Sequence, residues 1–220
     1  MPTNPPNPPK PSPPPTDLPI HAFPTASALE SFLEREHTTA AGFHLKFAKK
    51  ASGIQSVSPP DAVATALCFG WIDGRANPLD EHYWLVRYTP RRPKSIWSQK
   101  NVATVTRLLA QGRMRPAGLA AVEAAKIDGR WDRAYAGPAD MEVPRDFAEV
   151  LAGFPEAGRM FESLNKTERY AVLWRVQTAA PAVRAKRIGT LVGMLARGEK
   201  PGVGTDGGEK GEGDRKRKRK

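Results

Sequence analysis

The chain has 220 residues, with 34 lysines and arginines against 23 aspartates and glutamates, which gives a formal net charge of +11. This length allows one folded domain with tails, or two small domains at most. The single cysteine, Cys68, excludes an internal disulfide and a thiolate metal cluster, and no apolar segment approaches the ~20 residues that span a bilayer.

The two ends of the chain differ in composition from the middle. Residues 1–18 are rich in proline and predict a disordered arm, and residues 201–220 predict a disordered, glycine-rich tail. The arm has no hydrophobic stretch of the secretory type, so we expect an intracellular protein. We expect it to be cytoplasmic, or nuclear if the source is eukaryotic, in which case the basic run 215–220 is a nuclear localisation signal; in any other source we expect the run to tether nucleic acid.

The first half of the chain predicts a small sheet packed by helices. Alternating apolar and polar residues predict strands at residues 21–23, 43–47, 71–77 and 82–88. A turn at residues 77–80 joins the last two strands into a hairpin. Apolar residues at helical spacing predict helices after Pro24 and after Ser58, and Gly70 ends the second of them.

The second half of the chain predicts helices alone. Helical spacing and capping residues predict them at residues 101–111, 116–127, 144–151, 155–164, 165–177 and 181–198. The fold class is therefore α+β, with a small antiparallel sheet and packed helices in the N-terminal half and a helical C-terminal half. We expect one domain over residues 19–200, comprising an α+β part (19–97) and a helical part (98–200).

A carboxylate lies between aromatic and basic residues in the predicted strand from Trp71. Strand alternation places Trp71 and Asp73 on one face, followed by Arg75. An acid beside a tryptophan can act as a general base with a raised pKa, which makes Asp73 the candidate catalytic residue. Asp73 can equally be the structural partner of Arg75, Arg91 or Arg92.

The segment from Pro90 to Asn101 predicts an anion-binding loop. Prolines flank Arg91 and Arg92 and stiffen the backbone, and Ser98 stands where the next helix begins. Arginines beside a helix N-terminus attract anions, although ion pairs and a helix cap are the structural alternative. The predicted ligand-binding residues are Trp71, Asp73, Arg75, Arg91, Arg92, Lys94, Ser95, Trp97, Ser98 and Asn101. The spacing of the four histidines indicates no metal site, and no cofactor motif is present.

Several motifs in order resemble a known family. The strings LCFGWIDG, TPRRPKSIWSQKN, GRMRPAGLAAVEAAKIDGRWDRAY, ERYAVLWRVQTA and RAKRIGTLVGMLARG resemble the YdeI/OmpD-associated (OmdA, bacteriocin-protection) family, from about Phe23 to Lys200. The resemblance implies a role in resistance to cationic antimicrobial peptides and association with a porin. It brings no settled enzymatic activity.

Three hypotheses for the function follow. The first is a non-enzymatic binding module for an anionic partner, either nucleic acid or a phosphorylated ligand, because the body of the chain is basic. The second, from the family resemblance, is protection against cationic peptides through a protein partner. The third is an enzyme that acts on a small anionic substrate with Asp73 as base. We favour the first.

Overall fold

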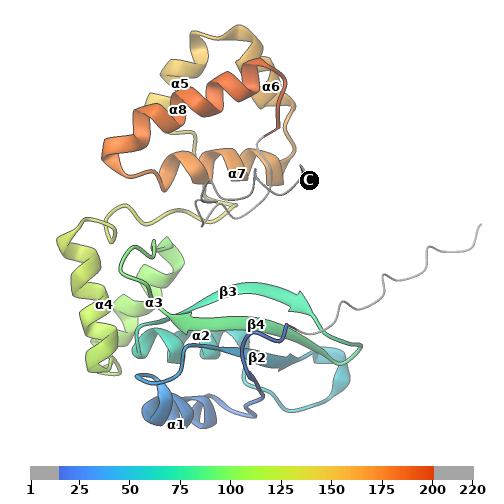
Figure 1. Cartoon of the computed structure of the whole chain (residues 1–220), viewed down its shortest axis with the longest axis vertical. Helices are drawn as coiled ribbons and strands as arrows, with labels where there is room; N and C mark the ends of the chain where they lie inside the picture. The colour runs from blue at the N-terminus through green and yellow to red at the C-terminus, as the bar shows by residue number, and fades with distance from the viewer. Residues whose placement is uncertain (1–14, 201–220) are drawn as a thin grey trace, which may run out of the picture. The chain divides into compact units, whose positions relative to one another are not determined.

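The computed structural model describes residues 15–200 (Figure 1). The predicted basic tail, with its run 215–220, and all of the predicted arm before residue 15 lie outside the described residues. The described residues divide into two compact units, one that ends at Ala134 (unit 1) and one that begins at Tyr135 (unit 2). Each unit has a core of its own.

Unit 1 is built on a four-stranded sheet. Its elements are β1 (Ile20–His21), α1 (Ala26–Glu36), β2 (Phe43–Ala48), a 3-10 turn (Lys50–Ser52), α2 (Pro59–Cys68), β3 (Trp71–Pro78), β4 (Tyr83–Pro90), α3 (Gln99–Ala110) and α4 (Pro116–Ile127). The strand order is β1-β2-β4-β3. The predicted hairpin is the antiparallel pair β3 and β4.

The α+β fold class is confirmed, with one correction to the sheet. β2 and β4 are antiparallel, but β1 pairs in parallel with β2, so the sheet is mixed and not purely antiparallel. The reason is the connection, because α1 carries the chain back along the sheet between these two strands, as a parallel crossover requires.

One face of the sheet forms the core of unit 1. Phe43, Leu45 and Phe47 alternate along β2 and are fully buried. Phe43 lies opposite Tyr88 of β4, and the two rings stack with their centroids 5.7 Å apart. Leu29 of α1 belongs to the same core. Burial of each such side chain stabilises the fold by about 2 kcal/mol.

The helices α3 and α4 belong to the unit that contains the sheet. Both contact α2, and their buried residues Val105, Leu108 and Val122 belong to the core of unit 1. The sequence placed everything from residue 98 in a helical part, whereas the structure groups residues 99–127 with the strands. A single domain over residues 19–200 stays a prediction.

Unit 2 is helical, as expected. Its helices are α5 (Arg145–Ala152), α6 (Pro155–Ser163), α7 (Lys166–Gln177) and α8 (Pro181–Ala196). Phe147 and Phe161 meet edge to face in its core, with ring centroids 5.4 Å apart. Asn165 and Glu168 form a capping box that starts α7, as their spacing predicted. None of the helices within residues 15–200 is long and apolar enough to cross a membrane.

Candidate anion-binding pocket

The turn that ends α2 is the foundation of the candidate site. Gly70 adopts φ +73°, a left-handed conformation that favours glycine, and its carbonyl accepts a 2.9 Å hydrogen bond from the backbone N–H of Arg91. The carbonyl of Cys68 accepts a 3.0 Å bond from the backbone N–H of Arg115. Two arginine-bearing segments, far apart in the sequence, therefore dock on one turn.

Helix α4 closes one side of this turn with small residues. A Cβ on Gly118 would lie 2.2 Å from the carbonyl oxygen of Cys68, and a Cβ on Gly70 would lie 2.8 Å from the carbonyl oxygen of Ala117. Both distances are shorter than van der Waals contact. Glycine is therefore required at both positions for the first turn of α4 to approach the end of α2.

A cavity of about 380 Å³ lies beside this junction. Its lining comes from the end of α1, the turn after α2, the loop after β4, and α4, and comprises His37, Thr38, Phe69, Gly70, Trp71, Pro90, Arg91, Arg92, Pro93, Ala117, Ala121, Ala124 and Arg130. The lining includes three arginines and no carboxylate.

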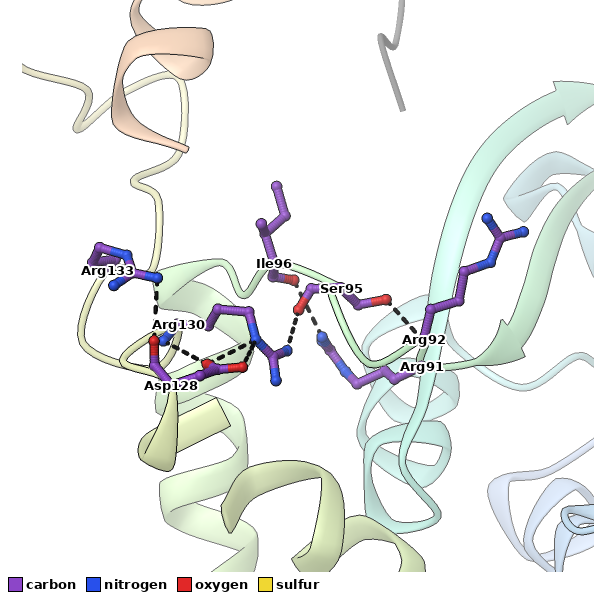
Figure 2. A network of polar contacts seen from close by, with 7 residues as sticks. All are labelled: Arg91, Arg92, Ser95, Ile96, Asp128, Arg130 and Arg133. Atoms are coloured by element: carbon purple, nitrogen blue, oxygen red, sulfur yellow. Dashed lines mark hydrogen bonds and ion pairs between the residues drawn. The ribbon is translucent and has the colours of Figure 1, made fainter. Parts of the chain in front are cut away.

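Arg91 is held in place by groups that orient its guanidinium. The guanidinium carbon lies 3.5 Å from the centroid of the Trp97 ring. Nη1 donates a 3.2 Å hydrogen bond to the carbonyl of Ile96 (Figure 2). Trp97 is buried. Trp97 is not among the residues that line the pocket, and its ring packs against Arg91, which is.

Arg130 reaches the same loop from the segment after α4. Its Nη1 donates a 2.7 Å hydrogen bond to the carbonyl of Ser95, and its Nε lies 2.6 Å from a carboxylate oxygen of Asp128 (Figure 2). The Arg130 guanidinium lowers the pKa of Asp128 below its usual value. Arg133 adds a 3.3 Å bond to the carbonyl of Asp128. The loop and the end of α4 are thus tied together.

The two serines of the loop have structural contacts. The Ser95 hydroxyl accepts a 3.0 Å hydrogen bond from the backbone N–H of Arg92, and the Ser98 hydroxyl accepts a 3.2 Å bond from the backbone N–H of Asn101. Ser98 is therefore the cap of α3, which is the structural alternative that the sequence left open. Neither serine nor Asn101 lines the pocket.

Asp73 lies outside the pocket lining. It is half-buried opposite Tyr88, and burial raises its pKa, while the charges of Arg91 and Lys100 act in the opposite direction. The position is fixed by register, because the strand pairing puts Asp73 beside a core tyrosine whose pKa is itself raised by burial. The candidate base is therefore not one of the residues that line this cavity.

Of the remaining predicted residues, some line the pocket and others lie outside its lining. Trp71 lines the pocket and is almost fully buried, with its indole N–H donating a 3.4 Å bond to the carbonyl of His37. Arg92 lines the pocket and is exposed. Arg75 lies at a register shift in β3 and, like Lys94, is exposed outside the lining. Of the ten predicted residues, the structure brings Trp71, Arg91 and Arg92 to the cavity.

The sequence analysis missed several lining residues. His37 ends α1, and its Nδ1 lies 2.8 Å from the carbonyl of Leu33. Arg130 follows the glycine that stops α4. A detectable signal was the row Ala117, Ala121 and Ala124, because small residues on one helix face indicate a close approach. Within residues 15–200, no group of three or more metal-ligating side chains comes together.

Two family models match this chain. Residues 140–198 match the family described as bacteriocin-protection, YdeI or OmpD-associated. The predicted resemblance is thereby confirmed over this segment, which lies in unit 2. Residues 21–121 match a domain of unknown function (DUF8412), and this segment holds the strings LCFGWIDG and TPRRPKSIWSQKN. No curated protein and no solved structure matches the chain.

Proposed function

We propose that unit 1 is a non-enzymatic binding module that holds a phosphate group, carried by a small ligand or by the end of a nucleic acid. The observation that supports this proposal is the composition of the cavity, whose lining holds Arg91, Arg92 and Arg130 and no carboxylate, with Asp128 paired with Arg130 from outside the lining. Planar guanidinium groups donate paired hydrogen bonds that match the geometry of phosphate oxygens.

The size and floor of the cavity suit a small anionic group. A volume of about 380 Å³ is within the range of roughly 300–1,000 Å³ that is usual for small-molecule pockets. Phe69 and Trp71 supply an apolar floor, and the alanines of α4 leave the space open. An anion there would lie between arginines on one side and apolar groups on the other.

Preorganisation favours affinity at this site. Arg91 is stacked on Trp97 and Arg130 is bonded to Asp128 and to the loop backbone, so neither side chain must be ordered when a ligand binds. Ordering a long side chain costs about 0.5–1.5 kcal/mol in a flexible site. Catalysis by Asp73 has no comparable support, because Asp73 does not line the cavity. Protection through a protein partner is supported by the family description alone.

Calorimetric titration of the full chain tests the proposal. The probes are inorganic phosphate, a nucleoside 5′-monophosphate, and a single-stranded oligonucleotide with and without a 5′-phosphate. We expect the phosphorylated probes to bind and Arg92→Gln to weaken them about tenfold or more, because one charge-assisted hydrogen bond contributes about 1.5–3 kcal/mol. Tighter binding of the oligonucleotide than of the monophosphate identifies nucleic acid as the partner.

Lys94→Gln is the matched control. Lys94 lies two positions from Arg92 in the same loop and is exposed, so its substitution removes one positive charge without altering the lining. We expect this variant to bind phosphate as the unmodified protein does. An equal loss in both variants, or no binding of any phosphorylated probe, would contradict the proposal.

A further inference from the structure

A second cavity, of about 520 Å³, lies within unit 2. Its lining combines two cationic residues, Lys166 and Arg169, with apolar ones that include Pro138, Met141 and Leu173. No carboxylate belongs to the lining. The cavity is distinct from the pocket of unit 1, and its lining residues from Met141 onward belong to the segment that matches the bacteriocin-protection, YdeI or OmpD-associated family.

Helix α7 arranges these groups along one face. Lys166, Arg169 and Tyr170 are spaced i, i+3 and i+4, and Leu173 follows at i+7, so the four side chains share a face of the helix. Leu173 is 2 % exposed and gives the cavity an apolar wall. The helix therefore presents positive charge at its first turn and an apolar surface one turn later.

The carboxylate nearest in sequence is engaged elsewhere. Glu168 accepts a 3.1 Å bond from the backbone N–H of Asn165, and its other oxygen lies 2.9 Å from Nζ of Lys200. Arg169 lies over the Phe161 ring, with its guanidinium carbon 4.4 Å from the centroid. Among the described residues, no carboxylate forms an ion pair with Lys166 or Arg169.

The opposite wall of the cavity is anchored to the same helix. The phenolic O–H of Tyr170 donates a 3.4 Å bond to the carbonyl of Ala136, whose N–H donates a 3.1 Å bond to the side-chain oxygen of Gln177. The rings of Tyr135 and Trp174 meet edge to face with centroids 5.9 Å apart. These contacts hold the segment before Pro138 against α7, so the cavity is a built feature of unit 2.

We infer that this cavity binds a small amphipathic carboxylate. The carboxylate group lies between Lys166 and Arg169, and the apolar body of the ligand lies against Pro138, Met141 and Leu173. The charge of the site and its apolar walls require both parts of the ligand, because an ion without an apolar body leaves the walls exposed and a neutral molecule leaves two cations uncompensated. The site differs in this respect from the three-arginine pocket of unit 1.

The test uses the full chain and octanoate, with octanamide as the neutral isostere and acetate as the ion without an apolar body. Calorimetry should show saturable binding of octanoate, with octanamide and acetate each at least tenfold weaker. The double variant Lys166→Gln/Arg169→Gln should weaken octanoate binding at least tenfold while its thermal unfolding remains cooperative.

The matched control is Lys186→Gln/Arg187→Gln, which removes two exposed charges from α8 of the same unit, outside the lining. It should leave octanoate binding unchanged. Arg92→Gln should also leave it unchanged, which separates this inference from the proposed phosphate site of unit 1. The inference is overturned if octanoate fails to bind, if octanamide binds equally well, or if both double variants weaken octanoate binding equally.

Discussion

Two arginine segments of unit 1 are alike in sequence and in backbone docking, and they differ in what surrounds their charges. Pro90–Pro93 and Arg113–Pro116 each place arginine next to proline, and each donates a backbone hydrogen bond to the turn after α2. Arg115 then reaches two carboxylates of α1, with Nη2 3.0 Å from Glu30 and Nε 2.6 Å from Glu34. Those carboxylates raise its pKa further.

The contacts that orient Arg91 include the ring of Trp97 and the carbonyl of Ile96. The two arginines therefore differ in position, because Arg91 lines the cavity and Arg115 does not. The carboxylates that pair with Arg115 join α1 to the start of α4, whereas the indole ring and the carbonyl fix the direction of Arg91 beside the cavity.

The largest expected effect is on the turn where both segments dock. Gly118→Ala should lower the free energy of unfolding of unit 1 by about 3 kcal/mol, because the new methyl group meets the carbonyl of Cys68. Urea denaturation monitored by circular dichroism measures this. The matched control is Gly158→Ala in α6, where no atom beyond the neighbouring residues and backbone of its own helix lies within 4 Å of the added Cβ. It should stabilise the chain by up to about 1 kcal/mol. Equal effects of the two variants would contradict the assigned close approach.

A smaller effect on the free energy of unfolding distinguishes an arginine of one segment, Arg115, from an arginine of the other, Arg92. Arg115→Gln should lower the free energy of unfolding by about 1 kcal/mol, since it removes two partly exposed ion pairs, and the loss should shrink in high salt. Arg92→Gln should change stability by less than about 0.5 kcal/mol, because Arg92 is exposed. A double-mutant cycle of Arg115→Gln with Glu34→Gln isolates the pair. The comparison fails if Arg92→Gln destabilises the protein as much as Arg115→Gln does.

The smallest effect concerns Arg87 of β4, which pairs with a carboxylate in the segment before β1. Asp17 pairs with Arg87 and lies 3.0 Å from Nε2 of His44, and these bonds, His44 first, lower its pKa to about 2. The unfolded value is about 3.9. The stabilisation is therefore present above about pH 4 and is lost as the pH falls toward 2. Asp17→Asn should be less stable than the unmodified protein at pH 7, and the two urea midpoints should converge near pH 2. A difference that is independent of pH would argue against the ion pair.

Local features were well predicted. The alternation of β3 and β4, the cap at Ser98 and the capping box of Asn165 all depend on residues within a few positions of one another. The parallel pairing of β1 was not predicted, because no local pattern indicates which strand lies next to a two-residue strand. The partners of α3 and α4 have no local signal for a related reason, since helical spacing reveals an apolar face but not what it packs against.

The sequence by itself determined the helices, most of the strands and the stiff arginine loop, because these follow from spacing, caps and proline. Only the tertiary structure decided which charges meet. Arg115 contacts carboxylates 81 and 85 positions away, and Arg130 bonds to a carbonyl 35 positions away. Strand register put Asp73 beside Tyr88 and outside the cavity. Ion pairs and pockets depend on contacts between distant segments, such as the close packing of Gly118 against the carbonyl of Cys68 at the turn after α2.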